Sequence, residues 1–199
     1  MHLRALIKSL EMTQFQPSEI QEFLEAADSY LESPFDLVII GGAAAALAYK
    51  ASKTTTDIDT ANRMPEELQH AFEAATKETG LAIPVSKAGV FDPPYCYADR
   101  LQQYDQINLK FLQVYVPEQH DLALMKIVRG YENDIQTICE IHENMPFCFE
   151  TLIERFLTEM TQVIGNSNTI RMNFLLAISE LFGEEFADQA EELTNNWQS

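Results

Sequence analysis

The sequence predicts an α+β fold, in which a small mixed β-sheet with flanking helices is followed by a helical C-terminal part. Three observations lead to this class. The apolar run 35–40 is short and contains several β-branched residues, as a buried strand does. An alanine-rich segment and a polar loop connect it to a second strand-like stretch at 55–61. From residue 118 onward, the chain reads as a series of helices almost to its end.

The helices of the first half have recognisable ends. A helix is expected over residues 16–32, with Ser18 as its N-cap and Gln21 completing a capping box. Residues 43–50 form a helix by propensity. Residues 65–80 form another, because a proline stands in its first turn and a glycine at its stop.

The clearest later strand is predicted over residues 106–116. Its apolar residues alternate in one phase up to Phe111 and in the other phase from Leu112, which indicates a β-bulge. The stretch 84–105 is rich in proline and tyrosine and predicts no clear element. The chain is divided into N-terminal helices at 1–34, a β-sheet core at 35–142 and a helical part at 143–199.

Composition narrows the class of protein. With 199 residues, the chain can form one domain with or without a helical appendage. No apolar run reaches the roughly 18 residues that a membrane span needs, and the N-terminus has no secretory signal. The three cysteines are odd in number and lack CxxC spacing. They are expected to be buried thiols in a reducing cytoplasm rather than disulfides or zinc ligands.

The net charge is strongly negative. The 31 acidic and 13 basic side chains give −18, which repels phosphate backbones at long range. This charge argues against a general nucleic-acid binder. It does not exclude a nucleotide, whose phosphates can be neutralised locally by metal ions. Solubility explains such acidity more simply than recruitment of a basic partner does.

A glycine pair follows the first strand. Gly41 and Gly42 stand where the strand gives way to the alanine-rich helix, whose first turn has unpaired N–H groups and a partial positive charge. Without a Cβ, the two glycines let a phosphate approach the backbone. The segment 35–60 therefore begins with the features of a phosphate site.

Two aspartates complete this segment. Asp57 and Asp59 stand at i and i+2 of the second strand, so both point to one face while Ile58 points into the core. Two carboxylates at that spacing can hold Mg²⁺, which prefers oxygen ligands together with substrate phosphates. Because the short connection returns the second strand beside the first, we expect the glycines and the aspartates to face one cavity. This pattern predicts a site for a nucleoside triphosphate (NTP) and Mg²⁺.

Two basic residues and two threonines can assist in binding the nucleotide. Lys126 and Arg129 are three apart on a predicted helix and share a face, from which they could neutralise a triphosphate and departing pyrophosphate. They could equally be solvated cations that pair with neighbours such as Glu132. Thr55 and Thr56 could donate to a phosphate, although threonine before a strand is common.

Two other interpretations remain for the first segment. A flavin- or NAD-binding unit also opens with a strand and glycines, but its G-x-G-x-x-G fingerprint is incomplete here, since Ala43 and Ala46 take its second and third glycine places. Alternatively, the glycines only form a tight turn and the aspartates a solvated strand end. The two halves together at this spacing favour the nucleotide site over both.

The stretch "IIGGAAAALAYKASKTTTDIDT" resembles the signature of the nucleotidyltransferase-fold superfamily, a helix start with G-[GS] followed by D-x-D. It is similar, more closely, to a bacterial nucleotidyltransferase-like family in which a later "PE-x-x-LA-x-K" helix precedes a basic residue and an aspartate. The stretch "VPEQHDLALMKIVRGYENDIQTI" matches this second signature. The matching residues are Pro117, Glu118, Leu122, Ala123, Lys126, Arg129 and Asp134.

The resemblance covers residues 35–140 and implies a function. Similar proteins include toxin components of bacterial toxin–antitoxin and phage-abortive systems, which are thought to transfer a nucleotide to tRNA or protein. The resemblance implies Mg²⁺-dependent nucleotidyl transfer, with Asp57 and Asp59 as catalytic metal ligands. The residues that it implies for nucleotide binding are Gly41, Gly42, Thr56, Lys126 and Arg129. An antitoxin or toxin would then be the partner, and strong tRNA affinity is not expected from so acidic a chain. The alternative is a catalytically degenerate protein that binds a partner.

One departure from the superfamily pattern bears on catalysis. Two-metal nucleotidyl transfer usually draws on a third carboxylate from a later strand. The strand predicted at 106–116 has Asn108 at the expected place, while Asp105 lies on the opposite face if pairing is regular. Asp92 or Asp99, in the preceding loop, could also reach the site. We therefore expect nucleotide binding to be more robust than turnover.

Overall fold

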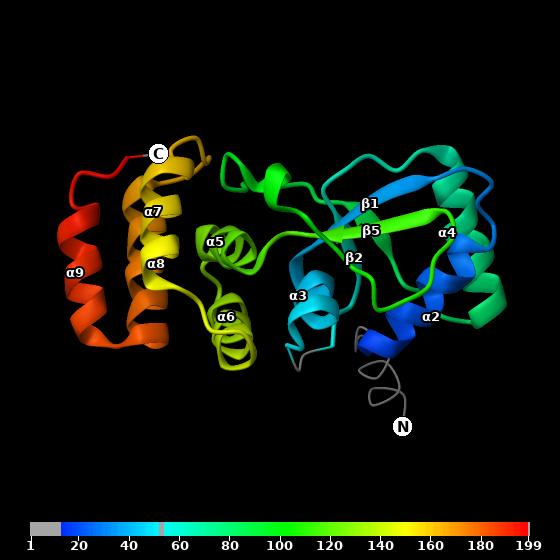
Figure 1. Ribbon diagram of the computed structural model, residues 1–199, viewed down its shortest axis with the longest axis horizontal. Helices are drawn as coiled ribbons and strands as arrows, with labels where there is room; N and C mark the ends of the chain where they lie inside the picture. Colours follow the sequence, from blue (N-terminus) through cyan, green and yellow to red (C-terminus); the bar gives the residue numbers. More distant parts are fainter. Residues whose placement is uncertain (1–12, 52–53, 199) are drawn as a thin grey trace, which may run out of the picture.

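The computed structural model describes residues 13–51 and 54–198, and it is elongated, with the β-sheet toward one end and the last helices of the chain at the other (Figure 1). Residues 1–12, which belong to the predicted N-terminal segment, lie outside the described residues. The elements, in chain order, are α2 (Pro17–Asp28), β1 (Phe35–Ile40), α3 (Gly41–Tyr49), β2 (Ile58–Thr60), α4 (Glu66–Thr79), β3 (Val85–Lys87), the 3₁₀-helix η1 (Tyr97–Arg100), β4 (Gln102–Gln103), β5 (Leu112–Val116), α5 (Gln119–Arg129), α6 (Glu132–Asn144), α7 (Phe149–Glu159), α8 (Ser167–Phe182) and α9 (Glu184–Thr194).

The sheet is mixed and has five strands in the order β3-β2-β1-β5-β4. The central strand β1 pairs antiparallel with β2, where Ile40 lies opposite Asp59, and parallel with β5, where Phe35 lies opposite Leu112. The pair β2–β3 is parallel and the pair β4–β5 is antiparallel. The predicted α+β class is confirmed, and the second strand does return beside the first.

Helices lie on both sides of this sheet. α2 and α4 pack against each other at one end of the molecule, and α3 lies between the sheet and the pair α5–α6 (Figure 1). The four alanines of α3, residues 43–46, are all buried. Their small side chains allow this helix to contact β1, β2, α2, α5 and α6 closely, which fixes its N-terminus relative to the strands.

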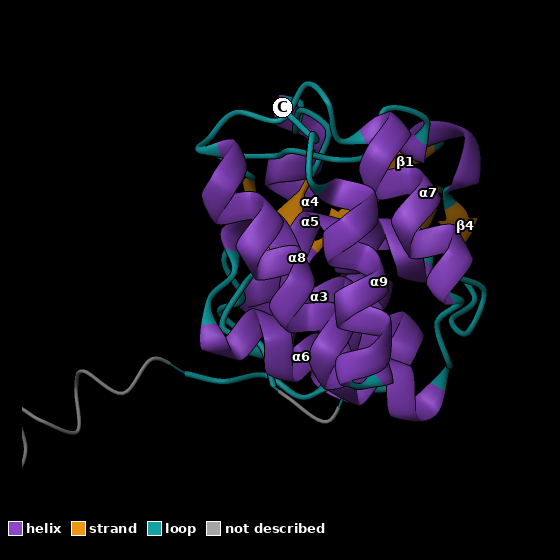
Figure 2. Cartoon of the chain, turned by 90° about the vertical axis from the view of Figure 1, so that its left-hand side faces the viewer, coloured by secondary structure: helices purple, strands orange, loops and turns teal. Residues whose placement is uncertain are grey.

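The C-terminal helices form a further layer. α8 packs on α5, α6 and α9, and Figure 2 shows α7, α8 and α9 in front of α5, with the strands behind. Phe156 stacks on Phe174 with their ring centroids 3.9 Å apart and contacts Trp197 at 4.4 Å. One continuous hydrophobic core extends from Phe15 to Trp197. In the described part of the chain, no helix is long and apolar enough to cross a membrane.

The start of α2 differs from the prediction. The helix begins at Pro17, and its N-cap is Gln16 rather than Ser18. Glu19 completes the capping box by accepting a hydrogen bond from the Gln16 backbone N–H at 2.7 Å, so Gln21 takes no part in it. Proline at the first helical position explains the earlier start, because its missing N–H is one that the helix could not have paired.

The strand predicted over residues 106–116 is only half present. Strand β5 begins at Leu112, and the residues before it form a loop without a β-bulge. The cause is Asp28, whose buried carboxylate accepts the backbone N–H groups of Lys110, Phe111 and Leu112 at 2.8, 2.8 and 2.6 Å. These donors are therefore satisfied by a side chain of α2 instead of a neighbouring strand.

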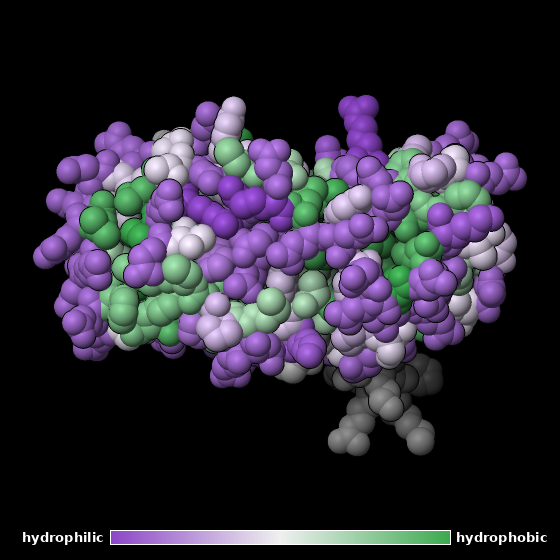
Figure 3. All heavy atoms as spheres, viewed as in Figure 1, coloured by the Kyte–Doolittle hydropathy of each residue, from purple (hydrophilic) through white to green (hydrophobic). Residues whose placement is uncertain are grey.

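The surface and the thiols complete the description. Hydrophilic residues cover most of the face in Figure 3, as the net charge of −18 leads one to expect, with apolar patches between them. All three cysteines are free, as predicted. The prediction that they are buried was wrong, since Cys96 and Cys139 are half-buried and Cys148 is exposed.

Candidate active site

The glycine pair brings a helix N-terminus against strand β2. α3 begins at Gly41, whose φ of 67° is one that residues with a side chain rarely adopt. A Cβ there would lie 3.2 Å from Oδ2 of Asp59, and a Cβ on Gly42 would lie 3.1 Å from Oγ1 of Thr55. The N-cap residue of this helix, Ile40, has no side chain that can accept a hydrogen bond, so the N–H groups of the first turn can receive an anion.

Asp57 and Asp59 lie beside this helix start. Asp59 is in β2 and Asp57 directly precedes it, while Ile58 between them is fully buried. Both carboxylates are half-buried, and neither forms a salt bridge with any residue that the structure describes. Burial and the nearby charge of Asp57 raise the pKa of Asp59, while Arg129 and Lys126 partly offset this rise. Two adjacent carboxylates that repel each other in this way fit a divalent cation.

Lys126 and Arg129 approach the aspartates from α5. Lys126 is buried, and both cations contact Oδ1 of Asp134 on α6, at 3.2 Å from Lys126 Nζ and 2.6 Å from Arg129 Nη2. Both cations therefore pair with Asp134. Oδ2 of Asp134 is buried and accepts no hydrogen bond from the described residues. Gly130, with φ of 61°, ends α5 and allows the turn that brings α6 alongside.

These residues surround one polar cavity of about 650 Å³. Six of the seven predicted site residues line it: Gly42, Thr56, Asp57, Asp59, Lys126 and Arg129. The seventh, Gly41, lines an adjoining cavity of about 220 Å³, and this second cavity shares Asp59, Lys126 and Arg129 with the first. The structure therefore brings together residues that are up to 88 positions apart in the chain, from Gly41 to Arg129.

The two threonines have local partners. Thr55 is buried, and its hydroxyl donates to the backbone carbonyl of Asp57 at 2.9 Å. The hydroxyl of Thr56 lies 3.4 Å from Oδ1 of Asp57. Both therefore position the loop that carries Asp57, and Thr56 also lines the polar cavity.

Comparison with known proteins identifies the family of the chain. Residues 17–183 match the model of a family described as nucleotidyltransferase of unknown function (DUF6036). The chain belongs to this nucleotidyltransferase family. No curated protein and no solved structure matches the chain significantly.

Asn108 does not occupy the position of a third carboxylate on a strand, because β5 begins only at Leu112. Asn108 is exposed in the loop before β5, and neither it nor Asp105 lines either cavity. On the side of β2 away from β1 lies β3, where Ser86 is opposite Asp59. Asp92, in the loop after β3, does line the smaller cavity. Among residues 13–51 and 54–198, no three acidic, histidine or cysteine side chains are grouped to hold a metal.

Sequence reasoning gave no role to several residues of the polar cavity. They are Gln14, Asn133, Asp134 and Thr137, three of which come from α6. Asp134 was visible in the second signature, and the proximity of Lys126 and Arg129 in sequence could have suggested a shared acidic partner. Gln14 could not be found in this way, because it reaches the cavity only through the bridge that pairs Phe15 with Thr55.

The Pro-Glu pair of the second signature, Pro117 and Glu118, directly precedes α5. Glu118 is the N-cap of this helix and contacts His120 and Arg155. Asp121 is fully buried and accepts hydrogen bonds from Arg100 and Arg155 at 2.8–2.9 Å. Glu159 of α7 accepts two further bonds from Arg100, at 2.6 and 3.0 Å. We call these six residues the α5 ion network: Arg100, Glu118, His120, Asp121, Arg155 and Glu159.

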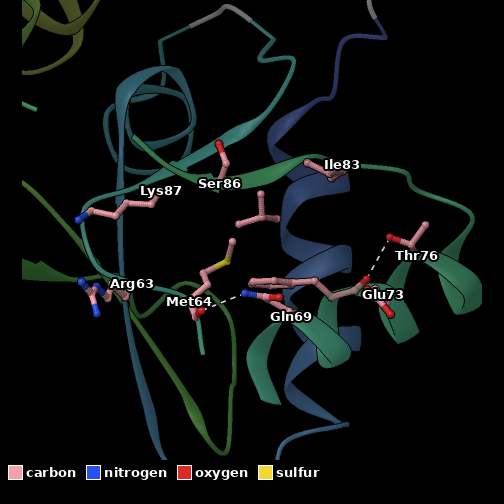
Figure 4. A pocket seen from close by; sticks show the side chains of 10 residues that line it. Arg63, Met64, Gln69, Glu73, Thr76, Ile83, Ser86 and Lys87 are labelled. Carbon is pink, nitrogen blue, oxygen red and sulfur yellow. Dashed lines mark hydrogen bonds between the residues drawn. The ribbon is translucent and has the colours of Figure 1, made fainter. Parts of the chain in front are cut away.

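A third hollow, of about 580 Å³, lies between α4 and the edge strand β3 and contains none of the predicted residues. Figure 4 shows Arg63 and Lys87 at one end of it, Met64 nearer the middle, and Gln69, Glu73 and Thr76 on α4. It lacks both a pair of carboxylates and a helix N-terminus. We therefore take the polar cavity that Asp57 and Asp59 line as the candidate site.

Proposed function

We propose that this chain binds an NTP together with Mg²⁺ in the polar cavity and transfers its nucleotidyl group to an acceptor hydroxyl. The observation that carries the proposal is the pair of half-buried carboxylates, Asp57 and Asp59, which have no cationic side chain at salt-bridge distance in the described chain. They adjoin an uncapped helix N-terminus and two cations. Mg²⁺ held by these carboxylates would polarise the α-phosphate and balance its charge.

The remaining residues then have distinct roles. The N–H groups at the start of α3 and the hydroxyl of Thr56 would hold the β- and γ-phosphates. Lys126 and Arg129, fixed by Asp134, would neutralise the charge that develops on pyrophosphate as it leaves. In the reaction, the acceptor oxygen forms a bond to the α-phosphorus while the bond to pyrophosphate breaks. The proton of the acceptor hydroxyl passes to solvent.

The acceptor is constrained by charge. A chain with a net charge of −18 repels an RNA backbone, so a protein hydroxyl, or an RNA presented by a basic partner, is favoured over free tRNA. A role as one component of a toxin–antitoxin pair fits this requirement for a partner. The free cysteines support a cytoplasmic setting.

A second candidate function rests on Ser86. Because Ser86 occupies the position opposite Asp59 where a third carboxylate would be useful, the chain is also suited to bind a nucleotide and a partner without turnover. The two candidates differ in whether the label of an NTP becomes covalently attached to an acceptor.

The test is a transfer assay with each of four α-³²P-labelled NTPs, Mg²⁺ and a lysate of the source organism. We expect label on a macromolecule with the wild type, and at least about a hundredfold less with Asp57→Asn/Asp59→Asn. Asp105→Asn, an exposed aspartate outside both cavities, is the control and should retain activity. Binding of an NTP without any transfer would favour the second candidate, and absence of both would refute the proposal.

A further inference from the structure

The smaller cavity beside Asp59 differs in character from the polar one. Its wall includes the apolar side chains Val90, Phe91, Met125, Val128 and Ile164. The two cavities meet at Asp59, Lys126 and Arg129, which line both of them. A single ligand bound at Asp59 can therefore extend a charged part into one cavity and an apolar part into the other.

Two unusual apolar side chains stand at the rim of this cavity. Ile164 is 86% exposed and Val90 is 77% exposed, the highest values among the large apolar residues that the structure describes. They come from loops far apart in the sequence, which are joined by a hydrogen bond of 3.3 Å from the Ile164 N–H to Oδ1 of Asp92. Exposed apolar residues that gather around one cavity indicate a surface that a ligand covers.

We propose that this apolar cavity binds the nucleobase of the NTP, while the polar cavity binds its triphosphate. The inference rests on the proposed function, since it places the α-phosphate at Asp59, where the two cavities meet. The volume of about 220 Å³ is below the roughly 300–1,000 Å³ of a site for a whole small molecule, so it suits one part of a ligand. Phe91 and the aliphatic side chains provide the apolar surface on which a flat base can lie.

Asp92 gives this cavity a means to select among bases. A carboxylate only accepts hydrogen bonds, and one oxygen of Asp92 already accepts from Ile164. Its other oxygen accepts no hydrogen bond from the described residues and suits the exocyclic amino group of adenine, guanine or cytosine. Uracil has no amino group, and the carbonyl oxygens beside its N–H repel a carboxylate. The site is therefore expected to bind UTP least well.

Calorimetric titration of the full chain separates the two cavities. The probes are the four NTPs and inorganic tripolyphosphate, each with Mg²⁺. Ile164→Ser should weaken binding of the preferred NTP by about fivefold to twentyfold, because a base would cover this side chain, and should leave tripolyphosphate unaffected. Met172→Ser is the matched control, since Met172 is also an exposed apolar residue but lies on α8 outside both cavities.

Each other outcome is decisive. If Ile164→Ser binds NTPs as the wild type does, the base does not lie here and the proposal is overturned. If Ile164→Ser weakens tripolyphosphate equally, the division between the cavities is wrong. If the wild type binds neither tripolyphosphate nor any NTP, the proposed function fails as well. Asp92→Asn should reduce the discrimination against UTP at least fivefold, and an unchanged ratio would remove Asp92 from base selection.

Discussion

Two clusters of charged residues lie at opposite ends of helix α5, and they are constructed differently. At its N-terminal end, every carboxylate of the α5 ion network has an arginine within salt-bridge distance. Near its C-terminal end, Asp57 and Asp59 adjoin Lys126 and Arg129, yet both cations contact Asp134 instead.

The pKa values express this difference. Burial pushes the pKa of Glu118 upward, but hydrogen bonds from His120 and Arg155 outweigh it and bring the pKa to about 2. Asp59 accepts no such bond from the residues that the structure describes, and its pKa is raised by burial and by Asp57. In the first cluster every carboxylate has an arginine partner, and the cluster joins η1, α5 and α7. In the second, Asp57 and Asp59 have no cationic partner at salt-bridge distance among the described residues, which suits a site that binds a cation.

The largest effect on stability is expected from the complete cluster. Asp121→Ala leaves Arg100 and Arg155 without their buried partner and should lower the free energy of unfolding by about 3–5 kcal/mol. Denaturant unfolding measures this change. Asp105→Ala, at an exposed position, should change it by less than about 0.5 kcal/mol. Equal losses in the two variants would mean that the network does not stabilise the fold.

The dependence on pH should have opposite signs in the two clusters. Glu118 has a lowered pKa, so its stabilisation of up to about 3 kcal/mol is present above its ordinary pKa of 4.5 and is lost as the pH falls toward 2. Asp59 has a raised pKa, so its ionisation costs stability as the pH rises above its ordinary value of 3.8.

Thermal unfolding of two variants from pH 2 to 8 tests these signs. Glu118→Gln should be less stable than the wild type at pH 7 and approach it at pH 2. Asp59→Asn should be at least as stable as the wild type at pH 7 and lose this advantage in acid. A destabilised Asp59→Asn at neutral pH would show that its carboxylate is satisfied within the fold.

The smallest effect on stability is expected when either of two glycines is replaced by alanine. Gly41 and Gly80 both have positive φ, at 67° and 73°, so alanine should cost about 1–2 kcal/mol at each. A Cβ at Gly41 approaches Asp59, whereas one at Gly80 meets nothing within 4 Å. Gly41→Ala should therefore weaken NTP binding in calorimetry while Gly80→Ala should not. A similar loss of affinity in both variants would mean that Gly41 only allows the backbone turn and has no specific role in NTP binding.

The strands and helices that the sequence predicted are those with strong local signals. The run 35–40, the glycine pair and the later helices depend on neighbouring residues only, and the structure contains them. The first half of the strand at 106–116 failed because Asp28, far away in the sequence, takes its backbone donors. Strand β3 was not predicted, since its three residues have no alternation and depend on pairing with β2.

The residues of the candidate site likewise divide into those that local sequence predicts and those that depend on long-range contacts. The seven predicted residues lie in two sequence signatures, and the structure gathers them around two adjoining cavities. Asp92 was predicted only as one of two loop aspartates, with Asp99, that could reach the site. Asp92 lines the same cavity as Asp59, and its carboxylate accepts a hydrogen bond from the Ile164 N–H. No local sequence pattern predicts this contact. Residues held by such long-range contacts are the ones that sequence reasoning could not rank.

The central claim is that Asp57 and Asp59 hold a divalent cation together with a nucleotide. Electron paramagnetic resonance of Mn²⁺, with each NTP present, measures this directly in the full chain. We predict that the wild type binds Mn²⁺ with NTP and that Asp57→Asn/Asp59→Asn binds it at least tenfold more weakly, with a melting temperature equal to or above that of the wild type. Equal Mn²⁺ affinity in the wild type and this folded variant would contradict the account.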